Sequence, residues 1–128
     1  MPERQAVSTE SAPAAIGPYS QGMRVGDLLF VSGQVPLEPS SGELVKEQIE
    51  GQARRCLENL TAVCEAAGGS LADAVRCTVY LTDMGDFARV NEVYAEFFEG
   101  GDPPARVAVG VAALPKGADV EIDAIVAL

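Results

Sequence analysis

Apolar residues alternate with polar or small residues in several short segments of the chain, which is the pattern of β-strands. Segments 19–25 and 28–35 show this pattern and are joined by Gly26-Asp27. A two-residue connection that contains glycine favours a β-hairpin, because glycine tolerates positive φ. A third strand is predicted over residues 74–81. Its apolar face is predicted to carry Val75, Cys77, Val79 and Leu81.

Two other segments have apolar residues at every third or fourth position, which is the spacing of an amphipathic helix. The first helix is predicted from Glu43 to Ala67, and Gly68-Gly69 ends it. Its apolar positions are Val45, Ile49, Ala53, Leu57, Leu60, Val63, Cys64 and Ala67. The second helix is predicted to be capped by Thr82-Asp83 and to run to about Phe98. Its inward residues are predicted to be Phe87, Val90, Tyr94, Phe97 and Phe98.

The last two strands are predicted at 105–111 and 120–126, with a turn at 114–118 between them. Residues 1–18 are polar and contain Pro13 and Gly17-Pro18, which favours an extended lead-in or a loop. The predicted order of elements is therefore ββαβαββ. We expect an α+β fold in a single domain that spans residues 1–128.

The predicted sheet has more apolar surface than two helices can cover. Residues from 107 to 112 are apolar or small on both sides of their strand, with Val107, Val109 and Val111 on one side and Ala108, Gly110 and Ala112 on the other. Sheets with two apolar faces are normally covered on both. We therefore expect the uncovered face to meet another subunit.

Two charged residues, Arg106 and Glu121, lie within predicted strands. Burying an unpaired charge is costly, so each needs a partner or a ligand. A guanidinium offers a planar fork that matches a carboxylate, and a glutamate can orient or deprotonate a water. Together they indicate a small pocket for an anionic metabolite. The alternatives are an arginine paired with an acidic neighbour and a solvated strand-end carboxylate that shares a polar strip with Asp123.

The composition narrows the classes of function. The chain has 128 residues, of which 48% are apolar and 22% charged, as in an ordinary globular domain. A net charge of −10 argues against nucleic acid or an anionic membrane as a partner, because both need a basic face. The absence of histidine removes the commonest general base and the commonest metal ligand.

The three cysteines form no CxxC pair. Cys56 and Cys64 are separated by roughly 12 Å along the predicted helix at 1.5 Å per residue, which is too far for a disulfide. Together with Cys77 they are interpreted as small core residues in a reducing compartment. The first five residues lack an apolar leader, and no run approaches membrane-spanning length, so a cytoplasmic location is expected.

Five ordered sequence blocks resemble the signature blocks of the RidA family, the YjgF-like reactive intermediate deaminases. They are Gly17-Pro18-Tyr19-Ser20-Gln21, Phe30-Val31-Ser32-Gly33-Gln34, Val90-Asn91, Pro104-Ala105-Arg106, and Leu114-Pro115 with Val120-Glu121-Ile122. The resemblance implies a chorismate-mutase-like fold and a homotrimer with a central barrel and clefts between subunits. It also implies hydrolysis of 2-imino acids and their enamine tautomers, such as 2-aminoacrylate, to 2-keto acids and ammonia without a metal or organic cofactor.

The same resemblance implies roles for individual residues. Arg106 matches the arginine that clamps the substrate carboxylate, and Glu121 matches the glutamate that holds the attacking water. The positions that line the cleft are matched by Tyr19, Ser32, Gly33 and Asn91. The Tyr19 phenol is expected to assist the enamine-to-imine proton shift, although a phenol pKa of about 10 makes it a weak base. Many members have Cys where this chain has Ala108, so the pocket wall is expected to differ and the chemistry to stay the same.

The chemistry is consistent with a site that lacks histidine. An imine is already electrophilic, and well-oriented binding can supply roughly 7–11 kcal/mol of barrier reduction. If the last two strands form a hairpin, Arg106 and Glu121 are roughly 16 Å apart at 3.3 Å per residue. Either bulges close this gap, or the site combines Arg106 of one chain with Glu121 of a neighbour. The second option agrees with the apolar sheet face.

Two classes of function are consistent with the sequence. The first is an imine and enamine hydrolase, and the second is a trimeric module that binds small 2-keto acids or other carboxylates without turnover. Both use Arg106, and Glu121 with Tyr19 favours catalysis. Ribonuclease activity, which is associated with some relatives, ranks last, because three chains that each carry a net charge of −10 repel RNA.

Overall fold

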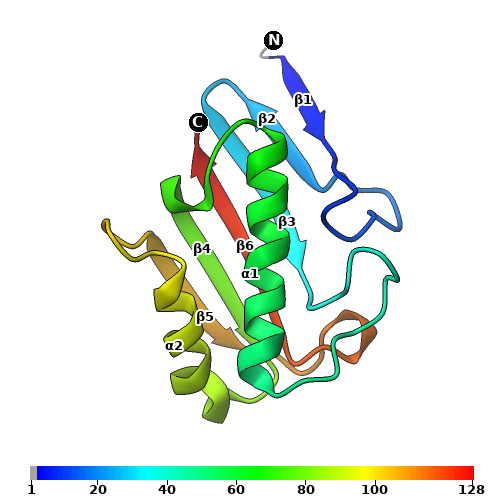
Figure 1. Ribbon diagram of the computed structural model, residues 1–128, viewed down its shortest axis with the longest axis vertical. Coiled ribbons are helices and arrows are strands. Elements are labelled where there is room, and N and C mark those ends of the chain that lie inside the picture. The colour runs from blue at the N-terminus through cyan, green and yellow to red at the C-terminus, as the bar shows by residue number, and fades with distance from the viewer. Residues whose placement is uncertain (1–2) are drawn as a thin grey trace.

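The computed structural model describes residues 3–128 and contains a six-stranded mixed sheet with two helices on one face (Figure 1). The predicted α+β class is confirmed. In chain order the elements are β1 (Arg4–Val7), β2 (Gly22–Val25), β3 (Leu28–Gln34), α1 (Ile49–Ala66), β4 (Ala74–Leu81), α2 (Phe87–Glu96), β5 (Ala105–Gly110) and β6 (Val120–Ala127). Short 3₁₀ turns occur at Leu71–Asp73, Met84–Asp86 and Pro115–Gly117.

The sheet has the strand order β1-β2-β3-β6-β4-β5. Only β4 and β5 run parallel, and every other neighbouring pair is antiparallel. The predicted hairpin between β2 and β3 is present, with Val25 opposite Leu28. Gly26 has φ +56°, the left-handed conformation that this tight turn requires.

The prediction of a hairpin between the last two strands is wrong. β4 lies between β5 and β6, parallel to the first and antiparallel to the second. The connection from β4 through α2 to β5 is a crossover, which is how two parallel strands in one sheet are joined. β5 therefore becomes an edge strand, and the distance estimated from a hairpin register does not apply.

Strand β1 falls within the segment that was expected to be a lead-in or loop. Residues 4–7 pair antiparallel with β2, from Arg4 opposite Val25 to Val7 opposite Gly22. Three of the four residues are exposed and only Val7 is buried. An exposed edge strand of this kind has no alternating apolar pattern, so the sequence does not predict the pairing of β1 with β2.

Helix α1 begins at Ile49, six residues later than predicted. The preceding segment is held in an extended loop by a bridge between Leu37 and Leu44 and by a hydrogen bond from the Val45 N–H to the Pro36 carbonyl. Val45 is buried there without being helical. Val45 lies four residues before Ile49, which is helical spacing, and for this reason the predicted helix began too early, within the loop. The end is as predicted, with Gly68 at φ +81°.

The predicted apolar face of β4 is wrong at Val75, because a β-bulge occurs at the start of this strand. Ala74 pairs with Val126 and Arg76 pairs with Ile125, so Val75 has no counterpart on β6. Ala74 is buried, whereas Val75 is 46% exposed. The remaining predicted inward residues, Cys77, Val79 and Leu81, are fully buried.

The core lies between the sheet and the two helices. Its largest fully buried side chains include Leu57, Leu60 and Val63 of α1 and Leu29, Leu81 and Ile122 of the sheet. The opposite face of the sheet is open in the single chain, and it exposes Leu28, Phe30, Val107 and Val109 by 38–42% each. Among residues 3–128, no helix is both long enough and apolar enough to cross a membrane.

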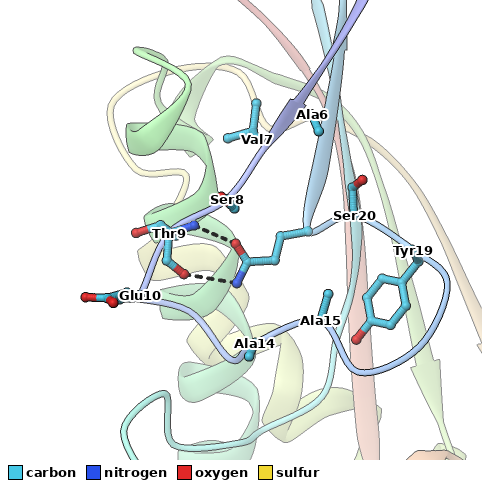
Figure 2. A pocket seen from close by; sticks show the side chains of 10 residues that line it. Ala6, Val7, Ser8, Thr9, Glu10, Ala14, Ala15, Tyr19 and Ser20 are labelled. Atoms are coloured by element: carbon cyan, nitrogen blue, oxygen red, sulfur yellow. Dashed lines mark hydrogen bonds between the residues drawn. The ribbon is translucent and has the colours of Figure 1, made fainter.

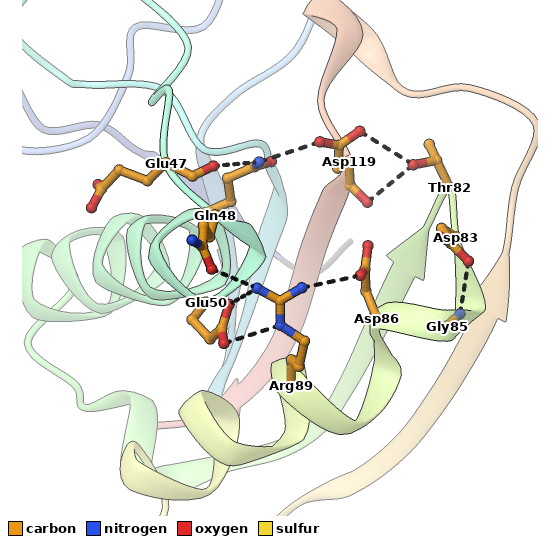
Figure 3. Close-up of polar contacts among 10 residues, drawn as sticks. Glu47, Gln48, Glu50, Thr82, Asp83, Gly85, Asp86, Arg89 and Asp119 are labelled. Atoms are coloured by element: carbon orange, nitrogen blue, oxygen red, sulfur yellow. Dashed lines mark hydrogen bonds and ion pairs between the residues drawn. The ribbon is translucent and has the colours of Figure 1, made fainter.

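Polar contacts join the two helices near their N-terminal ends (Figure 3). Arg89 of α2 donates two hydrogen bonds, of 3.0 and 2.6 Å, to the Glu50 carboxylate of α1 and a third, of 2.9 Å, to Gln48. The hydrogen bond from Arg89 lowers the pKa of the Glu50 carboxyl. Exposed ion pairs add little stability. These contacts link the N-terminal end of α2, the helix that carries Asn91, to that of α1.

Candidate active site

The predicted site residues fall into two groups on opposite faces of the sheet. Arg106 pairs with Cys77 on β4, and Cys77 is fully buried beneath the helices. Glu121 pairs with Tyr80 on the same strand, three residues further along. Side chains alternate between faces along a strand, so an odd separation places Arg106 toward the helices and Glu121 on the open face. A single chain does not bring the two groups together.

Arg106 belongs to the first group, on the edge strand β5. The expectation of a charge inside a buried strand is wrong for this residue, because an edge strand leaves its side chain exposed. Its Nη1 donates a hydrogen bond of 2.7 Å to Asn91 Oδ1 on α2. Its Cζ also lies 5.1 Å from the centre of the Phe87 ring and 4.8 Å from that of Tyr94. Among the ion pairs of residues 3–128, none involves Arg106.

A pocket of about 600 Å³ adjoins this guanidinium. Its wall comes from α2 and from the loop that connects α2 to β5, and includes Asn91, Tyr94, Phe98 and Pro104. Ala108, two residues along β5, pairs with the buried Val79 and packs partly against the core on the same face. Ala108 therefore shares a face with Arg106, but it is not among the residues that line this pocket.

Glu121 belongs to the second group, in a pocket of about 470 Å³ on the open face. This pocket also collects the predicted residues Tyr19, Ser32 and Gly33. Glu121 is half-buried, and burial together with the nearby Asp123 carboxylate raises its pKa. A raised pKa brings a carboxyl closer to the range in which it both accepts and returns protons near neutral pH.

A bulge in β3 shapes the floor of the Glu121 pocket. Val31 pairs with Ala124 and Gln34 pairs with Ile122, so two residues of β3 lie opposite one residue of β6. The extra residue places Gly33 directly against the Glu121 carboxylate. Ser32 donates through Oγ to the Ser20 carbonyl at 2.6 Å, which ties the bulge to the loop that carries Tyr19.

The loop from residue 8 to residue 21 carries Tyr19, which lines both the Glu121 pocket and a second pocket, shown in Figure 2. The buried Gln21 amide accepts a hydrogen bond from the Thr9 N–H at 2.7 Å and donates to the carbonyls of Thr9, Ala12 and Pro13. Tyr19 itself is 51% exposed. Its ring is therefore available to a ligand or to a second chain.

Three further residues that were not predicted as site residues lie in these groups. Lys116 lines the Glu121 pocket and is, among residues 3–128, the one non-glycine with positive φ, at 62°. Its place between Pro115 and Gly117, five residues before Glu121, was the available signal. Phe87 and Tyr94 were interpreted only as inward helix residues. Their spacing from Asn91 was the signal that they share its helix face.

The cysteines take no part in either group. Cys56, Cys64 and Cys77 are buried and free, which confirms their interpretation as core residues. Burial raises the pKa of each thiol, to about 12 for Cys64. Thiols with raised pKa are poor nucleophiles at neutral pH. Within residues 3–128, no group of three or more His, Cys, Asp or Glu side chains is placed to hold a metal ion.

Comparisons with known proteins cover almost the whole chain. The family model described as Endoribonuclease L-PSP matches residues 9–128. A RutC family protein of Pyrococcus horikoshii is 54% identical, and the match covers 95% of this chain and 96% of that protein. The 2-iminobutanoate/2-iminopropanoate deaminase of Mus musculus is 50% identical, over 95% of this chain and 90% of the mouse protein. The crystal structure of E. coli TdcF with bound serine has a TM-score of 0.93 and 44% identity, over 97% of this chain and 98% of that chain.

Proposed function

The chain belongs to the RidA family, and from that membership we propose that it hydrolyses 2-imino acids and their enamine tautomers to 2-keto acids and ammonia. The observation that carries this proposal is the chemistry of the two groups. One presents a guanidinium with no ion-pair partner among the described residues, and the other presents a half-buried carboxylate with a raised pKa. The first suits a substrate carboxylate, and the second suits a water and its protons.

The site is proposed to form between chains. Arg106 and Glu121 lie on opposite faces of the sheet, so a substrate small enough to touch both needs them from neighbouring subunits. The apolar residues on the open face support such an assembly, because contiguous exposed apolar surface is typical of interfaces. We propose a homotrimer in which each cleft joins the Arg106 group of one chain to the Glu121 group of the next.

The reaction proposed for this cleft begins with a protonated imine whose carboxylate is held by Arg106. Glu121 accepts a proton from water as the oxygen attacks the imine carbon, which gives a tetrahedral carbinolamine. The same carboxyl then returns the proton to nitrogen. The C–N bond then breaks as the C=O bond forms, and the ionised Glu121 accepts the hydroxyl proton. Ammonia leaves and takes up this proton as ammonium, and the 2-keto acid remains. Tyr19, which lines the same pocket as Glu121, is proposed to move the proton that converts an enamine to its imine.

The names of the relatives favour a small 2-imino acid or a similar amino acid as the substrate. The mouse relative is named a deaminase of 2-iminobutanoate and 2-iminopropanoate, and the E. coli relative carries serine, which has the same carboxylate next to a nitrogen-bearing carbon. A carrier that binds 2-keto acids without turnover is the competing function. The raised pKa of Glu121 favours turnover. A protein that only binds a carboxylate ligand through Arg106 does not need a proton-accepting carboxyl group beside that ligand.

The experiment generates 2-iminopropanoate and 2-iminobutanoate in the assay with an amino-acid oxidase. Release of keto acid and ammonia is followed with and without the protein, and the spontaneous rate is subtracted. We expect the wild type to accelerate release and Arg106→Ala and Glu121→Gln to lose the acceleration. A protein that binds 2-oxobutyrate and leaves the imine lifetime unchanged would be the carrier and would contradict the proposed deaminase.

A further inference from the structure

Helix α2 presents three uncharged side chains to the Arg106 guanidinium. Phe87, Asn91 and Tyr94 follow the spacing i, i+4, i+7, which places them on one face of the helix. Asn91 Oδ1 accepts a hydrogen bond of 2.7 Å, and the two ring centres lie 5.1 and 4.8 Å from Arg106 Cζ. Both distances fall within the range of cation–π attraction. Four side chains from two elements therefore form one unit.

The rings in this unit have little freedom. Tyr94 is 5% exposed and packs against Phe98 with ring centres 4.8 Å apart. Phe87 is the first residue of α2 and follows the turn in which Asp83 Oδ1 accepts the Gly85 N–H at 2.8 Å. Arg106 itself is fixed at the backbone by its pairing with β4. The rings are thus held by the core, and the guanidinium rests on them.

The way the guanidinium is held leaves it able to bind an anion. A guanidinium has five N–H donors, and Asn91 accepts one of them. Aromatic faces attract the cation without accepting its in-plane donors, and an amide oxygen carries no charge to neutralise it. A carboxylate in place of Asn91 would occupy the fork and cancel the charge. Neutral contacts orient the side chain and preserve both its charge and its remaining donors.

We propose that Phe87, Tyr94 and Asn91 are positioning residues that hold Arg106 as an uncompensated cation for the carboxylate of a small 2-imino or 2-keto acid. The proposal rests on the proposed function for the identity of the substrate. It goes beyond that function by assigning the fixed orientation of the clamp to α2 and by requiring that the residues which hold Arg106 be neutral.

The test uses four variants and one control in the full-length protein. Phe87→Leu removes a ring and keeps apolar bulk, and Phe87→Tyr restores the ring. Asn91→Asp keeps the shape and hydrogen-bond acceptor but adds a negative charge, and Asn91→Ala removes the acceptor. Phe97→Leu removes a ring from the end of the same helix at a position that lies outside the Arg106 pocket, so it reports the general cost of losing a phenyl ring.

Two readouts are needed. The first is the chemical shift of the Arg106 Nε–H proton by NMR, which the ring currents of Phe87 and Tyr94 displace and which needs no ligand. The second is the dissociation constant of 2-oxobutyrate by calorimetry, with kcat and KM for imine hydrolysis beside it. A structural defect alone would appear equally in the Phe97→Leu control.

We expect Phe87→Leu to move the Arg106 signal toward its free position and to weaken 2-oxobutyrate binding about two- to fivefold, the factor that corresponds to a cation–π contact. Phe87→Tyr should restore both. Asn91→Asp should weaken binding about tenfold or more, and more than Asn91→Ala, since a charged hydrogen-bond partner competes with the ligand.

An Arg106 signal that is the same in wild type and Phe87→Leu would overturn the proposal without any ligand or turnover. Wild-type affinity in Asn91→Asp would overturn the requirement for neutrality. A wild-type protein that binds 2-oxobutyrate but does not hydrolyse imines would instead remove the proposed function and leave the positioning role standing.

Discussion

The carboxylate of Glu121 occupies the space into which a side chain at Gly33 would project. A Cβ atom at position 33 would lie 2.9 Å from Glu121 Cδ and closer still to Oε2. The β3 bulge at Gly33 therefore leaves the space that the Glu121 carboxylate, the proposed water-holding group, occupies. Any side chain at position 33 would require the Glu121 carboxyl to move from its present position.

Gly33→Ala is expected to displace Glu121 while leaving the Arg106 group intact. The rate of imine hydrolysis should fall by about 10²-fold, a loss that a shift of roughly 1 Å in a reacting group can produce. Affinity for 2-oxobutyrate should change little. Steady-state kinetics and calorimetry measure the two effects. If Gly33→Ala acts through Glu121, adding it to Glu121→Gln will cause no further loss, and a fully additive double variant would contradict this explanation.

Asp123→Asn is expected to shift the acid limb of the pH–rate profile to lower pH. Burial and the Asp123 charge both raise the pKa of Glu121, and the substitution removes the second cause. Because the ionised Glu121 accepts the proton from water, kcat/KM falls as pH drops through that pKa. Asp123 accepts hydrogen bonds from the Thr78 N–H at 3.1 Å and from the Tyr80 hydroxyl at 3.0 Å. Asn keeps one oxygen for the Thr78 N–H, and its amide NH2 can donate to the Tyr80 hydroxyl oxygen, so the local structure should persist. An unchanged acid limb would show that Glu121 is not the group that titrates.

The sequence predicted those parts of the fold whose signal is local. Gly26-Asp27 predicted the hairpin between β2 and β3, because a glycine tolerates the positive φ of such a turn. The alternating residues of 74–81 predicted both ends of β4 correctly. The partner of β5 and β6 was not predictable from local sequence, because the two strands do not pair with each other and both pair with β4. Neighbouring segments of a chain usually pair, but here a strand from earlier in the chain lies between them. No pattern within residues 105–127 encodes that insertion.

The sequence predicted which residues form the candidate site, but not how these residues are arranged on the two faces of the sheet. The family blocks identified Arg106, Asn91, Tyr19, Ser32, Gly33 and Glu121, and the structure places each of them in one of the two groups. Which residues share a face depends on strand order and on the bulges at Val75 and in β3, which shift side-chain phase by one residue. The contacts of Phe87 and Tyr94 with Arg106 could not be predicted for another reason. The helical spacing of an aromatic residue is the same whether its ring packs against the core or against a cation.

Glu121→Gln is expected to be more stable than wild type at pH 7. Folding raises the pKa of this carboxyl, so the stability that comes with its protonated form is present at low pH and is lost as pH rises through the raised pKa. Glutamine stays neutral and avoids this loss. Urea unfolding should show a higher midpoint for the variant at pH 7 and a smaller difference below the ordinary carboxyl range. Equal midpoints at pH 7 would mean that the folded protein tolerates the ionised group without cost.

Gln21→Met is expected to loosen the loop that carries Tyr19. The Gln21 amide is buried and satisfies backbone groups of Thr9, Ala12 and Pro13, so its removal leaves those groups without partners. The cost should be about 1–3 kcal/mol in free energy of unfolding. Urea unfolding measures this cost, and hydrogen exchange should show the Thr9 amide losing protection. Retained protection would mean that another contact holds the loop.

Mixed assemblies of Arg106→Ala and Glu121→Gln chains are expected to regain activity that neither variant has alone. If each cleft uses Arg106 of one chain and Glu121 of the next, equal mixing gives both wild-type groups to about one quarter of the clefts in a cyclic trimer. Activity should therefore return to about a quarter of wild type after the variants are refolded together. Light scattering on chains of 13.3 kDa checks the trimer, and differently tagged chains check the exchange. If both groups came from the same chain, every cleft would keep one defect. A silent mixture of exchanged trimers would therefore disprove the shared site, and a monodisperse monomer would disprove the assembly on which it depends.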